Sequence, residues 1–446
     1  MAVWSEVKTG RLSSGLRLDA EHYQPLYLSY EKAVASGDLL GDLVVDIIHP
    51  VELTRVYEET GVPVLLAQNI RPNRIKFSPS VFMPESVRNL LARSRLHAGD
   101  VVMTRSGANF GDSASYFGSP PGASEYYACA DCLIIRSNHT SSGYLASYFS
   151  SKVGRALLTR GSYGAGQPHI SPTYLRTLRI PRFGQAEQRI HSMVEEARSF
   201  ELFATSEYSR AQKLLLASLG LEDLDRGPRL FFQRTYSEIR DAGRFDADYF
   251  SPYYQFVLER LSENGKTIGD VASLARRKFT PTMGTKFQYI EISDLTGEAE
   301  ALSQTIEAEE APSRAQWIVQ PGDVITSTVR PIRRLSALIG GEQGGFVCSS
   351  GFAVLSPTEV EPEVLLTYLR TPIISEILDL NTTASMYPAI SEERLLRVPI
   401  SLPSKSTRLK IVERIRASLS ARRKATRLLA DATIAVDRLI FKDLSS

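Results

Sequence analysis

The stretch Arg17-Leu-Asp-Ala-Glu-His-Tyr-Gln-Pro25 opens a pattern that the chain uses twice. It reappears as Arg244-Phe-Asp-Ala-Asp-Tyr-Phe-Ser-Pro252, and Gly99-Asp-Val-Val-Met-Thr104 reappears as Gly322-Asp-Val-Ile-Thr-Ser327. Self-similarity at a fixed period is the sequence signature of a repeated structural unit, so these matches bear on the fold before any single motif does.

Two more matches complete the repeat. Tyr148-Phe-Ser-Ser151 corresponds to Tyr368-Leu-Arg-Thr371, and Gln167-Pro-His-Ile-Ser171 corresponds to Tyr387-Pro-Ala-Ile-Ser391. All four matches keep the same order, at an offset of about 220 residues. One such match could arise by chance, whereas four in order predict a tandem duplication of one unit.

Each half of the chain has the residue pattern of a compact α+β domain. Short apolar and β-branched runs bounded by turn residues are typical of strands, and they occur in both halves. The runs are residues 62–66, 100–103 and 132–135, with the counterparts 287–290, 323–326 and 352–355. Helical stretches around residues 144–158 and 364–378 follow, late in each half.

Each half then ends in a long helix. The first is expected from Gln185 to Leu219, stopped by Gly220, and the second from about Ser406 to Ile440. Apolar residues recur at a spacing of three or four along each helix, which is the pattern of one buried face. These stripe residues are Ile190, Val194, Ala197, Ala204, Tyr208, Ala211 and Leu215 in the first helix, and Val412, Ile415, Leu419, Leu429, Val436 and Ile440 in the second.

Glu201 and Arg422 interrupt the stripes, so the helices do not form a regular heptad zipper. Each helix could pack only on its own domain. Nearly equal lengths and the internal duplication favour an antiparallel pair instead. The expected division of the chain is a globular domain at 1–184, a long helix at 185–220, a second globular domain at 221–403 and a second long helix at 404–446.

This arrangement of domain, helix, domain, helix resembles the specificity subunit of type I restriction–modification enzymes, over essentially the whole chain. The marks of the resemblance are Thr104-Arg105-Ser-Gly107 after the first Gly-Asp run and Thr328-Val-Arg-Pro331 after the second. The segments that begin at Gln167 and Tyr387, each before a proline-bounded entry to a long helix, also look like that family. The opening Arg17–Pro25 element departs from the plainer start of that family.

The resemblance implies a protein without catalytic residues, in which each domain reads one half of a split, asymmetric sequence in double-stranded DNA. The helices would serve as a spacer and as a docking surface for two methyltransferase subunits. A motor–nuclease subunit could join them. No cofactor is expected in this chain, because S-adenosylmethionine would bind the partner methyltransferase.

DNA contact needs arginine or lysine for phosphates and polar side chains for base edges. Such residues gather in loops beside the repeated strands. The candidate DNA-binding residues are Gln68, Asn69, Arg71, Arg74, Thr104, Arg105, Ser106, Asn109, Gln167, His169, Arg276, Arg277, Lys278, Arg330, Arg333, Arg334 and Tyr387. Because surface loops are polar in any protein, contact is best supported for Arg105 and Arg330.

The second helix is basic, with Arg414, Arg416, Arg422, Arg423, Lys424 and Arg427. These side chains could touch phosphates between the two half-sites. A solvated face, or a docking face for an acidic partner, is favoured over that interpretation, since charge runs on helices are usually solvated.

Composition excludes little, but motifs argue against catalysis by this chain. A net charge of +2 over 446 residues does not indicate nucleic-acid binding by itself, so a DNA reader would have to segregate its charge. A DNA methyltransferase grips its flipped base with an Asn/Asp-Pro-Pro-aromatic loop, and the only Pro-Pro is Pro120-Pro121. The six histidines form neither a triad spacing nor an HExxH motif.

The three cysteines, Cys129, Cys132 and Cys348, cannot make a disulfide framework and fit a reducing cytoplasm. Cys129 and Cys132 form one CxxC without a second pair at zinc-finger spacing, so we expect buried or half-buried thiols. The start has no apolar run behind its basic residues, which argues against a signal peptide. No stretch reaches the roughly 18 apolar residues that a membrane span needs.

A second class of function is a duplicated scaffold that binds proteins and never touches DNA. The helical stripes would serve it equally well, whereas the basic loops argue against it. We expect the helices to expose these apolar stripes, so that the isolated chain is poorly soluble or self-associates until a partner covers them.

Overall fold

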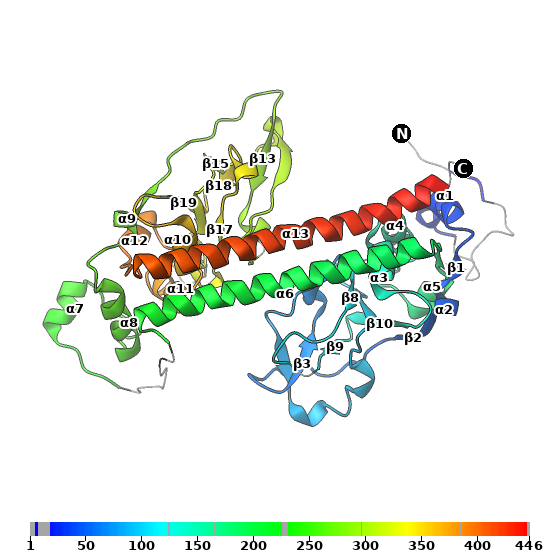
Figure 1. Ribbon diagram of the computed structural model, residues 1–446, viewed down its shortest axis with the longest axis horizontal. Helices are drawn as coiled ribbons and strands as arrows, with labels where there is room; N and C mark the ends of the chain where they lie inside the picture. The colour runs from blue at the N-terminus through cyan, green and yellow to red at the C-terminus, as the bar shows by residue number, and fades with distance from the viewer. Residues whose placement is uncertain are drawn as a thin grey trace. The chain divides into compact units, whose positions relative to one another are not determined.

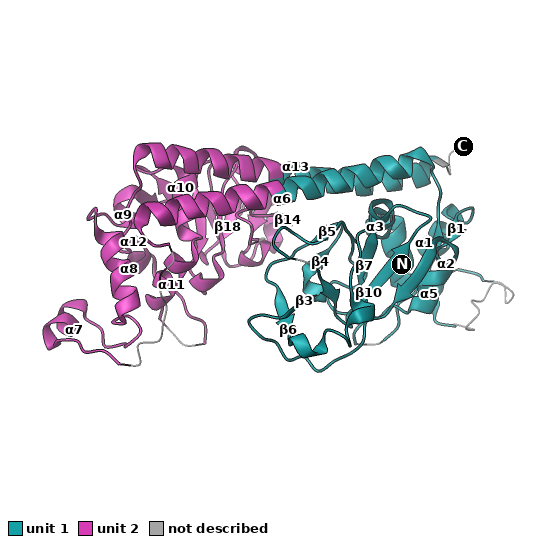
Figure 2. Cartoon of the chain, turned by 60° about the horizontal axis from the view of Figure 1, so that its bottom comes forward, with its two compact units in different colours: residues 1–202, 422–446 teal, residues 203–421 magenta. Residues whose placement is uncertain are grey.

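The structure is a computed structural model that describes residues 5–7, 18–123, 125–164, 166–222, 224, 231–295, 297–383 and 386–443. Arg17, with which the first repeat begins, lies outside these residues. Two compact units make up the chain: unit 1 comprises residues 1–202 with 422–446, and unit 2 comprises residues 203–421 (Figure 2). Each long helix contributes one part to each unit, so this division differs from the four consecutive segments expected from the sequence.

Unit 1 mixes short strands with helices, labelled in chain order in Figure 1. Its helices are η2 (Ala20–Tyr23), α1 (Pro25–Ala33), α2 (Leu40–Leu43), η3 (Ala67–Asn69), η4 (Glu85–Val87), η5 (Ala92–Ser94), α3 (Ser142–Ser150), α4 (Lys152–Arg160) and α5 (Pro172–Thr177). Its strands are β1 (Asp38–Leu39), β2 (Val44–Ile48), β3 (Val62–Leu65), β4 (Ile70–Arg71), β5 (Arg74–Ile75), β6 (Val81–Met83), β7 (Asp100–Thr104), β8 (Ser113–Tyr116), β9 (Tyr127–Ala128), β10 (Cys132–Ser137) and β11 (Arg179–Ile180).

The main sheet of unit 1 has the antiparallel order β2-β10-β7-β8, and a smaller sheet has the order β6-β3-β9. Its central strand β7 is buried on both faces. Val101 and Met103 lie in a core with α3 and α4, while Val102 lies in a second core with Ile70 and Ile75. Because successive side chains of a strand point to opposite faces, a strand covered on both sides needs an unbroken apolar run, which β7 has.

Unit 2 has a closely corresponding set of elements. Its helices are α7 (Tyr236–Ala242), α8 (Pro252–Ser262), α9 (Ile268–Val271), η6 (Ile292–Asp294), η7 (Ala308–Glu310), η8 (Pro331–Arg333), η9 (Gly341–Gln343), α10 (Pro362–Leu369), α11 (Pro372–Leu380) and α12 (Glu392–Leu396). Its strands are β12 (Ala272–Leu274), β13 (Lys286–Ile290), β14 (Gln304–Glu307), β15 (Ala315–Ile318), β16 (Val324–Ser327), β17 (Ser336–Leu338), β18 (Val347–Ser349) and β19 (Phe352–Pro357).

The two units share their strand order. The sheet β12-β19-β16-β17 of unit 2 matches β2-β10-β7-β8 of unit 1, and both are antiparallel throughout. In the second sheet, β13 pairs antiparallel with β14 and parallel with β18, as β3 pairs with β6 and β9. Unit 2 adds one strand, β15, at the edge of that sheet. The mixed helix-and-sheet class expected from the sequence is confirmed.

The long helices are α6 (Gln185–Leu219) and α13 (Lys405–Asp443). Their bounds agree with the sequence-based expectation to within a few residues, and α6 ends where Gly220 adopts a left-handed φ of 64°. In unit 1, Ile190, Val194 and Ala197 of α6 share a core with Leu429 and Val436 of α13.

In unit 2, Tyr208, Ala211 and Leu215 of α6 share a core with Ile415 and Leu419 of α13. Every stripe residue predicted from the sequence is at most 9% exposed. The expectation that the helices expose apolar stripes is therefore wrong, because both stripes are covered within their own units. Among the described residues, no helix is long and apolar enough to cross a membrane.

Candidate nucleic-acid interface

Two loops meet at the end of β7 in unit 1: residues 105–111, which follow β7, and residues 162–169, which follow α4. Isolated bridges join Ser106 to His169 and Tyr163 to His169, and the Ile170 amide donates to the Arg105 carbonyl at 3.2 Å. Ala165 of the second loop lies outside the described residues. We call these two loops the loop pair of unit 1.

Polar and aromatic side chains gather on this loop pair. The Arg105 guanidinium lies 3.5 Å from the Tyr163 hydroxyl, and the rings of Tyr163 and His169 are 5.8 Å apart. Gln167 is exposed, and Arg105 and His169 are half-buried. A guanidinium, an amide and an imidazole on adjacent loops are groups that can bind phosphates and base edges.

Asp131, between β9 and β10, holds the first of these loops in place. Its carbonyl accepts the Arg105 amide at 2.7 Å, and its carboxylate accepts the Ser106 hydroxyl at 3.2 Å and the Arg55 guanidinium at 2.5 Å. The hydrogen bond to Asp131 raises the pKa of Arg55 above its usual value. Arg55 therefore forms an ion pair with Asp131 beside the loop pair.

Unit 2 builds the same loop pair from residues 328–335, after β16, and residues 381–389, after α11. Val329 and Thr383 each form a bridge with Ala389, and the Ile390 amide donates to the Thr328 carbonyl at 2.9 Å. Ala384 and Ser385 lie outside the described residues. The backbone pattern is that of unit 1, with Val329 in the place of Ser106.

The side chains on the loop pair of unit 2 are different. Arg330 lies over the Tyr387 ring at 5.2 Å from its centroid, and its guanidinium lies 3.5 Å from the Met386 carbonyl. Met386 is 79% exposed and Tyr387 is 66% exposed. Arg333 and Arg334 are also exposed. This loop pair therefore combines guanidinium groups with large apolar surfaces.

Arg105 and Arg330, the two best-supported candidates, do not occupy equivalent positions. The Arg105 amide donates to the Asp131 carbonyl, and Thr328, not Arg330, makes the matching bond to Gly351. Arg330 stands instead where unit 1 has Gly107, and both have a positive φ, of 50° and 95° respectively. The threonine and arginine that both motifs contain therefore do not mark equivalent backbone positions.

A buried aspartate lies at the start of β7 and another just before β16, at the end of each strand opposite to the loop pair. Asp100 accepts the His97 amide at 2.8 Å and is paired with Arg136 at 2.8 Å. Asp323 accepts the Gln320 amide at 2.7 Å and is paired with Arg277. The Gly-Asp motifs found in the sequence are therefore a turn-forming and charge-pairing device within the fold.

Several candidates serve the fold and leave the proposed contact set. Asn69 is 2% exposed, and its amide binds the Leu66 amide at 2.9 Å and the Lys76 carbonyl at 2.7 Å. Thr104 is fully buried and donates to the carbonyl of Asn109. Ser106 is 3% exposed and bound to Asp131.

Two arginine candidates also form ion pairs with carboxylates inside their own units. Arg74 is paired with Glu201 of α6 and donates to Thr426 of α13 at 3.1 Å, so it anchors the β4–β5 hairpin to the long helices of unit 1. Arg277 is paired with the buried Asp323. The remaining candidates stay available at the surface.

Their environments differ. Gln68, Lys278, Arg333 and Arg334 are exposed, whereas Asn109 and Arg71 are half-buried. Arg71 donates to the Ile70 carbonyl at 2.7 Å. Arg276 is exposed, but it is paired with Glu392 at 2.6 Å and lies 5.2 Å from the centre of the Trp317 ring.

Tyr163, Met386 and Arg55 were missed in the sequence. Tyr163 and Met386 lie in the same loops as Gln167 and Tyr387, which were chosen, and their signal was a large side chain close to those residues. Arg55 is separated from Asp131 by 76 positions. No local pattern could have indicated that contact.

Most of the basic residues of the second helix have partners within their unit. In unit 2, Arg414 is paired with Glu207 at 2.8 Å and Arg416 with Glu363 at 2.6 Å. In unit 1, Lys424 lies 5.4 Å from the centre of the Phe200 ring. Arg422 is 8% exposed. More of the basic side chains of the second helix therefore interact with residues of their own unit than the sequence indicated.

The cysteines are free thiols. Cys132 and Cys348 are buried and Cys129 is half-buried, with 4.0 Å between the sulfurs of Cys129 and Cys132. Burial raises the pKa of Cys348 to about 12. Within the described ranges, no group of three or more His, Cys, Asp or Glu side chains could hold a metal ion.

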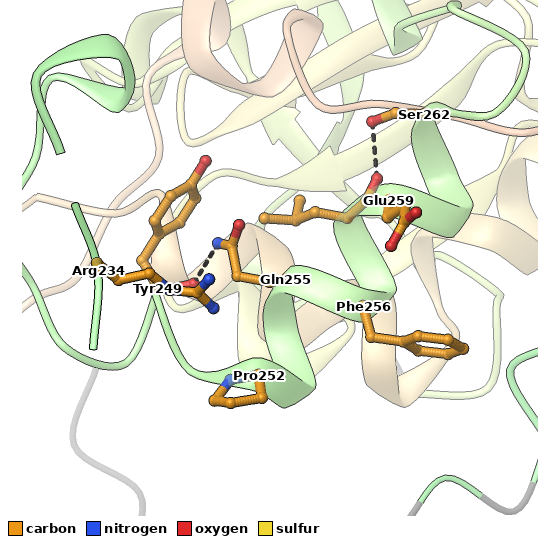
Figure 3. A pocket seen from close by; sticks show the side chains of 8 residues that line it. Arg234, Tyr249, Pro252, Gln255, Phe256, Glu259 and Ser262 are labelled. Carbon is orange, nitrogen blue, oxygen red and sulfur yellow. Dashed lines mark hydrogen bonds between the residues drawn. The ribbon is translucent and has the colours of Figure 1, made fainter. Parts of the chain in front are cut away.

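A pocket of about 450 Å³ lies elsewhere in unit 2, on the face of α8 (Figure 3). Arg234, Tyr249 and Phe256 are among its lining residues. The Gln255 amide donates to the Tyr249 carbonyl at 2.7 Å, and the Ser262 hydroxyl donates to the Leu258 carbonyl at 2.7 Å. The side chains of Gln255 and Ser262 thus donate to backbone carbonyls. None of the candidate DNA-binding residues lines this pocket.

No protein-family model matches the chain, and no curated protein matches it either. Solved structures do. The type I restriction–modification system S subunit from M. genitalium is 11% identical, with a TM-score of 0.42, and the match covers 90% of this chain and 94% of that one. The HsdS subunit from Thermoanaerobacter tengcongensis is 16% identical, with a TM-score of 0.28 and coverage of 90% and 95%.

A third match comes from a structure that describes complex assembly and conformational transition of the type I R-M system. It is 16% identical, with a TM-score of 0.28 and coverage of 90% and 96%. These solved structures come from the same kind of system that the sequence resembles. At these TM-scores the backbones overlap only in part, so function has to be inferred from the residues of this chain.

Proposed function

We propose that this chain is the non-catalytic, sequence-specific DNA-binding subunit of a type I restriction–modification system. Each unit would be a target-recognition domain, and the two would read the halves of a bipartite, asymmetric target. The target is asymmetric because the loop pairs carry different side chains, with Gln167 in unit 1 where unit 2 has Tyr387.

One observation carries this proposal: the same strand order supports a loop pair with an exposed or half-exposed arginine in both units. Arg105 and Arg330 lie on equivalent loops although not at equivalent residues. A repeated framework with divergent surface loops is what two readers of different half-sites need, because the loops touch the bases while the framework positions them.

We further propose that α6 and α13 pair antiparallel and separate the two readers. Two contacts within unit 2 support this direction: Glu207 pairs with Arg414, and the Ala204 carbonyl accepts the Ser418 hydroxyl at 2.7 Å. Residue numbers thus fall along α6 as they rise along α13. A helix of 35 residues, such as α6, rises about 50 Å, which exceeds one turn of B-DNA, about 34 Å.

The partners in this proposal are double-stranded DNA, two methyltransferase subunits and, where restriction occurs, motor–nuclease subunits. S-adenosylmethionine would bind the methyltransferase, and this chain would carry no cofactor. Exposed apolar residues on the outer faces of the long helices, such as Phe203, Leu409 and Ile434, offer contact surface for the methyltransferases. The complex is expected to act in the cytoplasm, where its DNA is.

A gel-shift experiment tests DNA binding. The complex of the chain with its methyltransferase would be titrated onto random-sequence duplex at 50 and 200 mM salt. We expect a steep loss of affinity at the higher salt, because bound arginine and lysine release counterions from DNA. Absence of binding at both salt concentrations would instead indicate a protein-binding scaffold.

A further inference from the structure

The turn that carries Arg330 is held in an uncommon backbone conformation. Arg330 and Arg334 flank the 3₁₀ turn η8 (Pro331–Arg333), and both have a left-handed φ, of 50° and 56°. Residues with a Cβ atom rarely adopt this conformation, and it persists only where the surroundings impose it. Strain at a surface turn with two arginines indicates a functional constraint.

Arg370 of the segment after α10 imposes that conformation from inside. Its side chain is 8% exposed, and it donates to the Arg334 carbonyl at 2.8 Å and the Ser336 carbonyl at 3.1 Å. It also donates to the Tyr208 hydroxyl of α6 at 2.8 Å and the Gly297 carbonyl at 2.6 Å. The buried guanidinium of Arg370 thus holds the end of the turn through its hydrogen bonds.

Beside this rigid turn lie two large apolar side chains, which we call the apolar tip: Met386 and Tyr387. They are 79% and 66% exposed, although the neighbouring Ile390 is almost completely buried. The Arg330 amide donates to the Pro388 carbonyl at 2.7 Å, which ties the tip to the strained turn. The guanidinium of Arg330 also covers one face of Tyr387, at 5.2 Å.

Unit 1 has no such tip. The residues at the positions of Met386 and Tyr387, counted from the shared bridges, are Gly166 and Gln167. The position of Arg330 is taken by Gly107, whose positive φ costs little in glycine. Unit 1 therefore presents hydrogen-bonding groups where unit 2 presents apolar surface beside positive charge.

We propose that the apolar tip inserts between base pairs and bends the half-site read by unit 2, while unit 1 reads its half-site without such insertion. This inference rests on the proposed function. Arg330, Arg333 and Arg334 supply the charge that complements phosphates, and the partner is therefore duplex DNA. Apolar side chains inserted at a base step unstack it and kink the duplex, and an aromatic ring then stacks on an exposed base.

The test uses the full chain in complex with its methyltransferase. The probe is a duplex of about 40 base pairs that carries the target defined by methylation mapping, long enough to cover both half-sites. One 2-aminopurine is placed at successive positions, since its fluorescence rises when it unstacks. Dyes at the two ends report the bend by energy transfer.

With the wild-type chain, we expect 2-aminopurine fluorescence to rise at one step in the half-site of unit 2 that is distinct from the base flipped by the methyltransferase, together with a bend. The double variant Met386→Ala/Tyr387→Ala should abolish both signals and weaken binding by about tenfold or more. Leu302→Ala, another exposed apolar residue of unit 2 outside the loop pair, should leave the fluorescence rise unchanged.

Three results would overturn the inference: a tightly bound wild-type complex that unstacks no position besides the flipped base, a double variant that unstacks the same additional step as the wild type, or a double variant that loses its methyltransferase in sedimentation instead. Failure of the proposed function would look different, because the wild-type complex would then bind no duplex at all. Circular dichroism of the double variant controls for folding.

Discussion

Unit 1 and unit 2 share one strand order but present different chemistry at their loop pairs. In unit 1 the loops carry Arg105, Gln167 and His169, whereas in unit 2 they carry Arg330 and the apolar tip of Met386 and Tyr387. The bonds that join the loops are made by backbone amides and carbonyls in both units. The loop framework is thus independent of the side chains that it displays, so each unit can change its readout without changing its fold.

The largest effect on stability is expected at the buried aspartates Asp100 and Asp323, which occupy equivalent positions in the two units. Asp100→Ala leaves Arg136 without its partner and the His97 amide without an acceptor, so the free energy of unfolding should fall by about 3 kcal/mol. Asp323→Ala should do the same in unit 2, through Arg277 and Gln320. Urea unfolding measures both.

Asp42→Ala, at an exposed aspartate of unit 1, is the matched control and should change stability by less than about 0.5 kcal/mol. If Asp100→Ala and Asp42→Ala had equal effects, the buried charge pair would not stabilise unit 1.

A second comparison concerns DNA affinity. Arg105→Ala and Arg330→Ala should each weaken binding to the mapped target about tenfold, which corresponds to about 1.4 kcal/mol per lost arginine contact. The salt dependence of binding should become shallower if the lost contact is to a phosphate. Fluorescence anisotropy at two salt concentrations measures both quantities.

Arg240→Ala, at an exposed arginine on α7 that is paired with Asp241, serves as the control for loss of charge. An equal loss of affinity in this variant would show that net charge, and not the loop pair, governs binding.

A third comparison changes the residues at two equivalent positions, Arg330 in unit 2 and Gly107 in unit 1. Arg330→Gly should raise the stability of unit 2 by about 1 kcal/mol, because it removes the steric cost of a left-handed φ, while DNA affinity falls. Gly107→Ala should destabilise unit 1 by a similar amount, since its φ of 95° is unfavourable for a residue with a Cβ atom.

Thermal unfolding of both variants checks these signs. A destabilised Arg330→Gly would mean that the arginine side chain supports the turn and that its backbone is not strained.

These contrasts also show how far sequence reasoning reaches. The stripe residues of α6 and α13, such as Ile190 and Val436, were recognised because helical periodicity survives any choice of partner. The role of Asn69 could not be recognised, because an asparagine in a loop looks alike whether it binds DNA or, as here, the carbonyl of Lys76.

The register of each loop pair follows from the motif beside it. The Gly-Asp motifs are 223 positions apart, from Gly99 to Gly322, whereas Ser171 and Ser391 are 220 apart. The offset of 223 places Gly107 at the position of Arg330, and the backbone bridges give the same alignment. Partnerships such as that of Arg74 with Glu201, by contrast, depend on tertiary structure and leave no local pattern in the sequence.

The smallest expected effect is a pH dependence of stability that unit 1 should show and unit 2 should lack. Burial lowers the pKa of His191, which accepts the Gly143 amide at 3.1 Å and must be neutral to do so. Stability from this contact is complete above the unfolded pKa, about 6.5, and falls as the pH drops below it, because the unfolded state then binds the additional proton.

At the equivalent position of α13, unit 2 has the buried Ile411 and should show no such dependence. Unfolding curves between pH 7 and pH 5 would show a small loss in the wild type and a smaller one in His191→Gln. An identical pH dependence in the two proteins would contradict the assignment.

The measurement that tests the central claim most directly is methylation mapping of DNA from cells that carry the chain and its methyltransferase, before and after residues 1–184 are replaced by the first domain of another specificity subunit. We predict a split, asymmetric methylated motif in which the replacement changes one half and leaves the other half intact. A continuous motif, or a replacement that changes both halves or neither, would contradict the account of two independent readers.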